Sequence, residues 1–500
     1  MRDKSSYIVK ILVERWWALA VIAALLVFVV SLALGRGQSV WFDEGYSIML
    51  AHESYGEILS LTGVDAHPPG YYFLLKAWGD TFGWSELALR SLSALFAAGA
   101  VGLLAVLIRK LFSREVALLA LPFITLAPFW LRYGYEIRMY SLAGLVGVAA
   151  SLVLFYAVQK RINKLLWATY GALVALGMYV LYMTLALWVA HFAWLLWSRR
   201  KNLFKQPWVG AYVLSLLLFA PYLPTFIHQI THSALPGVGS EININAAGNV
   251  VSMLTLYIPD WQLGKWSALL IFVYIGIIIA VWVKVRGTLS PKAKKSLQYA
   301  SFLALGPLVF YVVYGLAASK PYFIVRYVAH VAPLLYALVA VVLAYGVLKL
   351  AGRARAAVVL VAAVVLTAGV VNVAQAGNFV LERNQHPTGA EVRRDVDCSD
   401  TTVVADGAYE YIDNFYYYDG CDLRFYSTTH IDYNGGYAWL ANHDYKRVLE
   451  PSDVTSKNID VVYYPKQDGR PDFVPSAKYH LVSSQEYGSI KLDKYSLSAE

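Results

Sequence analysis

Two adjacent carboxylates, Asp43 and Glu44, follow the first long apolar block of the chain, in the segment 41–46. Charged side chains at the edge of a membrane tend to face a cavity lined by protein or water, because burying charge in lipid is costly. An ionised carboxylate in such a place can accept a proton from a hydroxyl nucleophile. The alternative is an ordinary helix N-terminus, where an acidic residue is common. The pair therefore predicts a general base or a helix cap.

A second motif places His67 directly before Pro68 and Pro69, followed by glycine and two tyrosines. Consecutive prolines fix φ and lack backbone donors, so they form a rigid bend that holds the histidine in a defined place. A histidine in that position can bind a phosphate or carry a proton. The alternative is a structural turn with a surface histidine.

A third group lies between two apolar blocks, in the segment 132–140, which contains Glu136, Arg138 and Tyr140. Arg132 and Arg138 can hold an anion, with Glu136 ordering them or contacting substrate. A cluster of mutual ion pairs at the interface is the alternative.

A fourth group, Arg326 and Tyr327, stands before a late apolar block, and Arg90 is a weaker candidate of the same kind. An arginine can hold a phosphate through two parallel hydrogen bonds. The alternative is an arginine that extends to lipid headgroups.

The elements that position these residues follow from composition: 58% of the 500 residues are hydrophobic and 15% are charged. The apolar blocks are long enough to cross a hydrocarbon core of roughly 30 Å, and backbone in lipid must be helical. The sequence therefore predicts a polytopic α-helical membrane protein with about 11 transmembrane helices. They are expected near residues 17–34, 88–108, 116–131, 139–158, 165–181, 185–198, 208–224, 266–283, 297–317, 327–348 and 356–376.

Lysine and arginine gather in every second connection between these blocks, beginning with the N-terminal segment. The positive-inside rule then places the N-terminus in the cytoplasm and the C-terminus outside, in a multi-pass protein of the plasma membrane. A cleaved signal sequence is the alternative interpretation of the first block. The net charge of +9 is explained by this distribution, so no nucleic-acid partner is predicted.

The composition changes at the end of the apolar blocks, which predicts a membrane domain over residues 1–378 and an extracytoplasmic α/β domain over residues 379–500. Strand-prone runs occur at 401–405, 460–464 and 479–483. Both cysteines, Cys398 and Cys421, lie in this domain, and an oxidising compartment favours a disulfide between them. Two buried thiols are the alternative.

Two outer segments, 35–87 and 225–265, are long enough to contain a site. Within the first, the stretches 44–59 and 71–84 are amphipathic and carry scattered tryptophan and tyrosine. Such stretches predict short helices at the membrane interface.

The order of these motifs resembles the GT-C glycosyltransferases, over residues 10–375. It is most similar to the branch that holds the protein O-mannosyltransferases of glycosyltransferase family 39 and the aminoarabinose transferase that modifies lipid A. The resemblance implies a polyprenyl-phosphate sugar donor, Asp43 as catalytic base and Glu44 as its neighbour in catalysis. It implies a phosphate held by Arg138 and Arg326, and Glu136 as the second acidic position. Members of the family often carry a lysine at the position of His67.

The predicted reaction is sugar transfer to a hydroxyl of an envelope acceptor (protein, glycolipid or polysaccharide) on the outer side of the membrane. One base suffices, because a phosphate leaves without protonation. Direct displacement inverts the anomeric carbon, since no second carboxylate is suited to a covalent intermediate. No metal or other cofactor is predicted. The rival hypotheses are a transporter or flippase, which predicts charges buried in mid-span, and a non-catalytic envelope assembly protein.

Overall fold

The computed structural model describes residues 11–36, 38–159, 163–199, 206–232, 266–318, 325–383, 389–466 and 469–498. The chain folds into two compact units. The helical unit comprises Met1–Leu32, Arg90–Phe226 and Pro236–Gln375. The loop–sheet unit comprises Ala33–Leu89, Ile227–Leu235 and Ala376–Glu500. The first outer segment thus groups with the C-terminal part of the chain, whereas the predicted boundary at residue 378 assigned it to the membrane domain.

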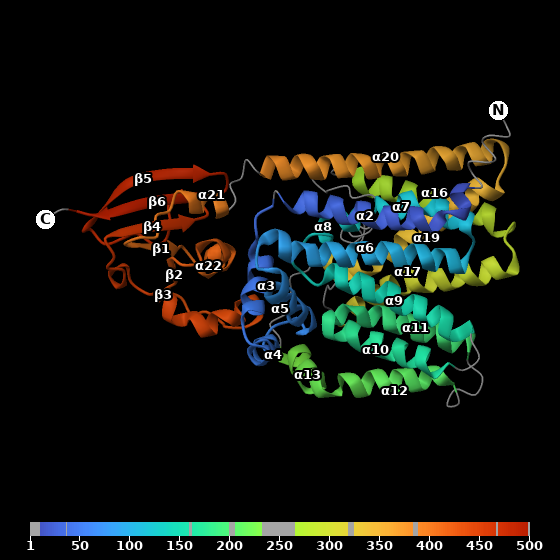
Figure 1. Ribbon diagram of the computed structural model, residues 1–500, viewed down its shortest axis with the longest axis horizontal. Coiled ribbons are helices and arrows are strands. Elements are labelled where there is room, and N and C mark those ends of the chain that lie inside the picture. Colours follow the sequence, from blue (N-terminus) through green and yellow to red (C-terminus); the bar gives the residue numbers. More distant parts are fainter. Residues whose placement is uncertain are drawn as a thin grey trace. The chain divides into compact units, whose positions relative to one another are not determined.

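The helical unit contains a helix at each of the predicted spans (Figure 1). These helices are α2 (Trp16–Gly35), α6 (Glu86–Leu111), α7 (Arg114–Thr125), α9 (Tyr140–Gln159), α10 (Lys164–Val180), α11 (Leu185–Ser198), α12 (Pro207–Phe219), α16 (Trp266–Arg286), α17 (Pro291–Ala318), α19 (Ala332–Lys349) and α20 (Gly352–Arg383). Among the described residues, seven helices are long and apolar enough to cross a membrane, and α10 and α11 are shorter apolar helices. The chain is a multi-pass membrane protein, and the number of eleven spans stays a prediction.

The helices of this unit differ in how far they are enclosed by protein. In an apolar 18-residue stretch of α19, 78% is buried within the protein. The buried share of the corresponding stretch of α20 is 17%. α19 packs against α7, α16 and α17, while α10 packs between α9 and α12. The apolar side chains that α20 exposes, such as Leu360, suit a lipid-facing surface.

One predicted span, 116–131, is interrupted in the structure. α7 ends at Thr125, and the short helix α8 (Pro128–Tyr133) follows it. Pro128 lacks a backbone donor and disfavours helical geometry in the residue before it, which accounts for the break. Further short helices of the chain are η1 (Tyr182–Thr184), η3 (Ala220–Tyr222), α13 (Leu223–His232), α18 (Val325–Val328) and η4 (Ala329–Val331).

The loop–sheet unit is built on a six-stranded sheet of order β3-β2-β1-β4-β6-β5. The strands are β1 (Thr401–Ala405), β2 (Asp422–Tyr426), β3 (Arg447–Val448), β4 (Asn458–Tyr463), β5 (Tyr479–Tyr487) and β6 (Ile490–Leu497). β1 runs parallel to β2 and β4, whereas β6 is antiparallel to β4 and β5. The predicted α/β character of this part is thereby confirmed, and the three strand-prone runs overlap β1, β4 and β5.

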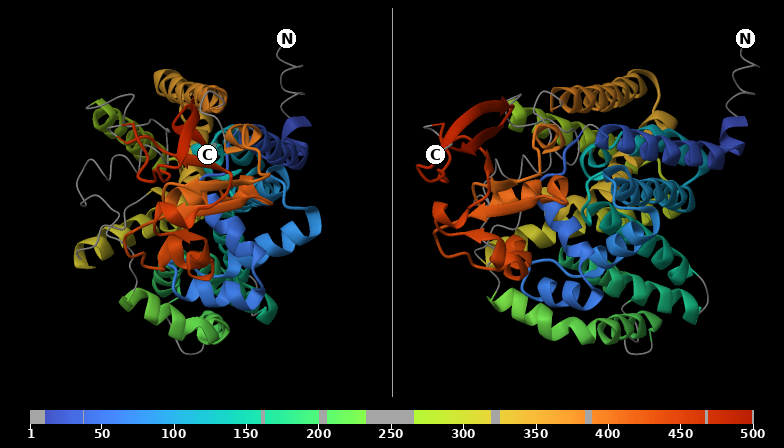
Figure 2. Two further views of the ribbon diagram at one scale, coloured as in Figure 1. Left: turned by 90° about the vertical axis from the view of Figure 1, so that its left-hand side faces the viewer. Right: turned by 60° about the vertical axis from the view of Figure 1, so that its left-hand side comes forward.

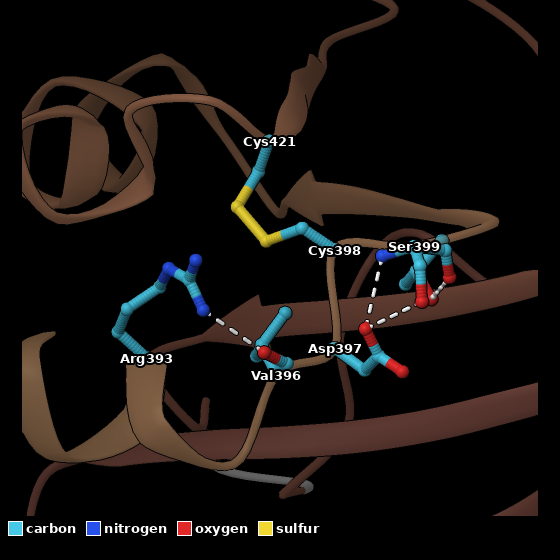
Figure 3. The surroundings of a disulfide bond; sticks show 7 residues. Arg393, Val396, Asp397, Cys398, Ser399 and Cys421 are labelled. Carbon is cyan, nitrogen blue, oxygen red and sulfur yellow. Dashed lines mark hydrogen bonds between the residues drawn. A yellow bond between two sulfur atoms is a disulfide. The ribbon is translucent and has the colours of Figure 1, made fainter.

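Helices and a disulfide complete this part of the unit. α22 (Ala408–Phe415) packs against β1 and β2 (Figure 2). The other helices of this part are α21 (Gly389–Arg394), η5 (Tyr416–Tyr418), η6 (Gly435–Lys446) and η7 (Pro451–Asp453). Cys398 and Cys421, the predicted pair, form a disulfide just before β1 (Figure 3). In the same turn, Asp397 accepts hydrogen bonds from the Ser399 backbone and hydroxyl at 3.0 and 2.6 Å. The cross-link limits the conformations open to the unfolded chain.

The first outer segment contains three helices, α3 (Phe42–His52), α4 (Tyr55–Gly63) and α5 (Gly70–Phe82). The predicted amphipathic stretch 44–59 is divided between α3 and α4 at Ser54. The Ser54 hydroxyl accepts from the Glu57 backbone at 3.3 Å, and the Glu57 carboxylate accepts from the Ser54 backbone at 3.0 Å. This reciprocal capping box starts a new helix and so ends the first.

Asp460 in β4 predicts how the stability of this unit depends on pH. Its side chain is buried, and that burial raises its pKa from 3.8 to about 6. The folded protein therefore binds this proton more tightly than the unfolded chain, so stability is greatest below about pH 4 and falls as the pH rises to 6. We expect a loss of at most about 3 kcal/mol over this window.

Thermal unfolding of the full chain in detergent between pH 4 and 7 measures this effect. Asp460→Asn should make the dependence shallower, and the remaining slope comes from Asp406, whose burial likewise raises its pKa from 3.8 to about 6. Asp419→Asn, at an exposed position, should leave the dependence as in the wild type. Equal slopes in the wild type and Asp460→Asn would show that the titrating group lies elsewhere.

Candidate active site

Asp43 and Glu44 occupy the first turn of α3, which begins after Trp41. Glu44 is buried, and Asp43 is partly exposed. The N-terminal end of a helix carries partial positive charge and so stabilises a nearby carboxylate. The Ser47 hydroxyl donates to the Asp43 carbonyl oxygen at 2.8 Å, which further orders this turn. Trp41, and not Asp43 or Glu44, is the N-cap residue of α3, so the helix-cap alternative is not met, whereas a carboxylate in the first turn can act as a base.

Residues on either side of the pair fix α3 against α22. The ring of Phe42 stacks on Tyr409, with centroids 4.6 Å apart and planes 3° apart, and meets the edge of Tyr437 at 5.6 Å. At Gly45 the helices approach so closely that an added Cβ would lie 2.5 Å from the carbonyl oxygen of Ile412. The catalytic candidate is therefore held by residues more than 360 positions later in the chain.

The close approach at Gly45 makes this position sensitive to a single methyl group. Gly45→Ala forces α3 away from α22, and we expect it to lower stability by about 1–3 kcal/mol, the usual cost of overpacking. Differential scanning fluorimetry of the full chain measures the shift in melting temperature.

The matched control is Gly56→Ala in the exposed part of α4, where an added Cβ meets only the Ser54 hydroxyl at 4.0 Å. That change should be neutral or slightly stabilising, because alanine favours helix more than glycine does. If both variants melt like the wild type, the contact between α3 and α22 is looser than the structure has it.

Further hydrogen bonds join the first outer segment to the C-terminal part of the same unit. The Tyr417 hydroxyl accepts from the Val40 backbone and donates to Glu86, both at 2.8 Å. The Trp439 indole donates to Glu53 at 2.8 Å, and burial raises the pKa of that carboxyl. The remaining bonds run from the Tyr416 hydroxyl to the Trp84 carbonyl and from the Gly435 backbone to the Val64 carbonyl.

His67 lies in the same unit, in the bend before α5. Its Nδ1 atom is 3.6 Å from the Oδ2 atom of Asp65, a buried carboxylate. Asp65 also accepts from the Ala66 backbone at 2.6 Å, and the Gln229 amide donates to the carbonyls of Thr62 and Asp65. The rigid bend predicted from the prolines is thus reinforced by Asp65 and Gln229, which orient the histidine.

Glu136, Arg138 and Tyr140 are buried in the helical unit, between α8 and the start of α9. The Ser93 hydroxyl on α6 donates to the Glu136 carbonyl at 2.6 Å, and the Arg138 backbone donates to the same oxygen at 2.7 Å. Tyr133 meets Tyr140 edge to face, with centroids 4.8 Å apart. This turn is therefore a closely packed polar group.

Arg326 belongs to the same group. Burial raises the pKa of Tyr133, and the charges of Arg132, Glu136 and Arg326 have smaller effects on it, which places these residues near its hydroxyl. The Arg326 guanidinium carbon lies 5.8 Å from the ring centre of Tyr327. The Tyr327 carbonyl accepts from the Tyr311 hydroxyl at 3.4 Å. Residues 319–324, which precede Arg326, lie outside the described residues, as do residues 233–265 of the second outer segment.

The structure thus gathers the predicted residues into two groups. Asp43, Glu44 and His67 belong to the loop–sheet unit. The helical unit contains the others: Arg90, which is 1% exposed on α6, and Glu136, Arg138, Tyr140, Arg326 and Tyr327. Within the described residues, no group of three or more His, Cys, Asp and Glu side chains is arranged to hold a metal ion. The prediction that the protein needs no metal stays a prediction.

Sequence reasoning missed the residues that orient the predicted ones. Asp65 stands two positions before His67 and could have been noticed from that spacing. Tyr133 and Ser93 gave no signal of their own, because each acts through a backbone carbonyl or a ring contact. Tyr409 and Tyr437 could not have been found, since the sequence does not reveal that they meet Phe42.

Comparison with protein families supports the resemblance seen in the motifs. Residues 66–224 match the family described as dolichyl-phosphate-mannose-protein mannosyltransferase. This match begins just before His67 and includes the segment with Glu136 and Arg138. No curated protein sequence matches the chain at a significant level.

Solved structures extend the similarity to nearly the whole chain. The apo structure of ArnT from Cupriavidus metallidurans superposes with a TM-score of 0.62 at 16% identity, covering 96% of this chain and 98% of that one. The structure of the same protein bound to undecaprenyl phosphate gives a TM-score of 0.60 at 15% identity, with the same coverage. Identity at this level establishes the fold alone. The chain therefore has the ArnT-like GT-C fold that its motifs predicted, with a C-terminal domain built on a sheet.

Proposed function

We propose that the protein transfers a sugar from a polyprenyl-phosphate donor to a hydroxyl group of an envelope acceptor, on the extracytoplasmic side of the membrane. The observation that carries this proposal is the similarity of fold to ArnT over 96% of the chain, including a structure with undecaprenyl phosphate bound. A polyprenyl phosphate is the product that remains when such a donor loses its sugar. The family match over residues 66–224 supports the same class of donor.

In the proposed reaction, Asp43 removes the proton from the acceptor hydroxyl as its oxygen attacks the anomeric carbon. The bond between this carbon and the phosphate oxygen breaks, and the lipid phosphate leaves with the bonding electron pair. Asp43 suits the role because it lies partly exposed in the first turn of α3, at the positive end of the helix dipole. Glu44, buried beside it, positions the base. Direct displacement inverts the anomeric centre.

Arg138 and Arg326 hold the donor phosphate and stabilise the charge that develops on it. The charge of Arg326 acts on Tyr133, and the Arg138 backbone donates to the Glu136 carbonyl in the turn that follows Tyr133, which supports a joint role. Arg90, Glu136, Tyr140 and Tyr327 of the helical unit are assigned to substrate binding, and so is His67 of the loop–sheet unit. A phosphate held by guanidinium groups needs no protonation to leave, so no acid is required.

Placement of the reaction on the outer side rests on the distribution of charge. Lysine and arginine concentrate in alternate connections, which puts the N-terminus in the cytoplasm and the C-terminal domain outside. The disulfide between Cys398 and Cys421 supports this orientation, because disulfides persist in oxidising compartments.

Sugar transfer by the purified full chain in liposomes tests the proposal. The assay supplies a panel of radiolabelled polyprenyl-phosphate sugars with membrane extract as acceptor, and follows label in acceptor and release of polyprenyl phosphate. We expect one donor to be consumed with inversion at the anomeric carbon. Retention would require a covalent intermediate and overturn the single-displacement mechanism. Movement of an intact donor between leaflets without transfer would establish a flippase.

A further inference from the structure

A cavity of about 650 Å³ lies at one edge of the sheet in the loop–sheet unit. It is lined by residues that directly follow β1 and β2, together with Tyr437 of η6 and Asp472 after β4. In the parallel part of the sheet, β1 connects to β2 on one side and pairs with β4 on the other. Ligands of open α/β sheets bind beyond the carboxyl ends of strands where neighbouring connections diverge in this way. We call this space the sheet-edge cavity.

The side chains of the sheet-edge cavity define the chemistry of its ligand. Tyr409 and Tyr437 present aromatic surface, and Asp406, Glu410, Asp432 and Asp472 present carboxylates. The other lining groups are mainly serine, threonine and asparagine, with one histidine, His430, whose Nε2 atom lies 3.3 Å from Asp432 Oδ1; no lysine or arginine is among the described lining residues. Carboxylates accept strong hydrogen bonds from hydroxyl and ammonium groups, and aromatic rings pack against the apolar faces of ring-shaped ligands. Because four carboxylates face a single histidine in this lining, a phosphate or carboxylate on the ligand would be repelled.

Asp406 and Asp472 already make hydrogen bonds or ion pairs within the protein. The carboxylates that remain for binding a ligand are therefore the other two. Asp406 accepts from the backbones of Asp472 and Phe473 at 2.8 and 2.6 Å, and Asp472 pairs with Lys466. Glu410 stands in the first turn of α22, where burial raises the pKa of its carboxyl. A half-buried carboxylate of this kind gains from a ligand that donates hydrogen bonds to it.

One wall of the sheet-edge cavity is shared with the helix that carries the proposed base. Tyr409 and Tyr437 contact the ring of Phe42, and Phe42 directly precedes Asp43. The charge of Asp43 is among the influences, after burial and Asp413, that raise the pKa of Tyr409 to about 12. A ligand seated on these tyrosines is therefore held beside the carboxylate that must meet the acceptor hydroxyl.

We infer that the sheet-edge cavity binds a saccharide unit of the acceptor that carries neither phosphate nor carboxylate, and presents its hydroxyl to Asp43. This inference rests on the proposed function and narrows its acceptor to a glycan or glycolipid. Tyr409 and Tyr437 pack against the sugar ring, and Glu410 accepts hydrogen bonds from its hydroxyl or amino groups.

Binding of the full chain in detergent to immobilised oligosaccharides tests the inference without any donor. The panel contains uncharged, amino-bearing, phosphorylated and uronic-acid-bearing glycans. We expect retention on uncharged or amino-bearing glycans, weakened at least tenfold by Glu410→Gln and by Tyr437→Ala, while Tyr437→Phe keeps the ring and most of the binding. Controls are Glu486→Gln on the exposed face of β5 and Tyr445→Ala, whose side chain is 75% exposed, and both should bind as the wild type does.

The outcomes separate this inference from the proposed function. Asp43→Asn should retain glycan binding while losing transfer. Glycan binding by a wild-type protein that shows no transferase activity with any donor would overturn the proposed function and leave the cavity assignment in place. Retention only on phosphorylated or uronic-acid-bearing glycans, binding that survives Glu410→Gln and Tyr437→Ala, or no retention on any glycan would each overturn the assignment. Gel filtration of every variant shows whether a loss of binding reflects a loss of fold.

Discussion

Asp43→Asn is expected to lower the turnover number by about 10²–10⁴-fold, the usual contribution of a general base. The amide has the shape of the carboxylate and can accept a hydrogen bond, but it cannot take the proton of the acceptor hydroxyl. The Michaelis constant for the donor should change little, because the donor phosphate is assigned to arginines of the helical unit. Initial rates of label transfer at saturating donor, with folding checked by thermal unfolding, measure the effect.

The matched control is Asp80→Asn, in α5 of the same outer segment. Asp80 is 49% exposed and pairs with Lys76 at 3.4 Å, so its loss should alter turnover less than twofold. Glu44→Gln separates the two adjacent carboxylates, and a partial loss there would fit a positioning role. Full turnover in folded Asp43→Asn combined with an inactive Glu44→Gln would transfer the role of base to Glu44.

The division of the chain into apolar helices could be predicted from the sequence because lipid imposes a simple pattern. Each span needs a long apolar block, and a helix of the structure lies at each block. The interruption after Thr125 follows from Pro128, which was visible in the sequence but was not used. Among the strands, the apolar runs of β1 and β4 were found, whereas β2 and β6 mix charged and apolar residues and gave no clear signal.

The surroundings of the site could be predicted only in part. Asp43 and Glu44 were identified because two carboxylates after a span are unusual, whatever they touch. The residues that hold them, such as Tyr409 and Ile412, act through ring stacking and close backbone approach across more than 360 positions of sequence. Composition changes near residue 379 and suggests a boundary there, yet the compact unit includes the first outer segment. When a unit is assembled from distant segments, the local composition of each segment does not indicate which other segments it packs with.

Arg138→Gln is the second change with a large expected effect, a loss of about 10²–10³-fold in kcat/KM for the donor. Arg138 is 3% exposed, and its backbone donates to the Glu136 carbonyl in the turn between α8 and α9. Glutamine keeps a hydrogen-bond donor but removes the charge that offsets the negative charge developing on the leaving phosphate. Arg138→Lys keeps the charge without the paired geometry, so its loss should be intermediate.

Arg114→Gln supplies the control, because Arg114 is exposed at the start of α7 and is not part of the polar group around Tyr133. We expect it to change kcat/KM less than threefold. A leaving group that is more acidic than the natural phosphate needs less stabilisation of its negative charge. With a donor that carries such a phosphate analogue, Arg138→Gln should therefore lose less of its kcat/KM than with the natural donor. An equal deficit with both donors would mean that Arg138 supports the fold of the turn rather than the departing phosphate, and its role would pass to Arg326.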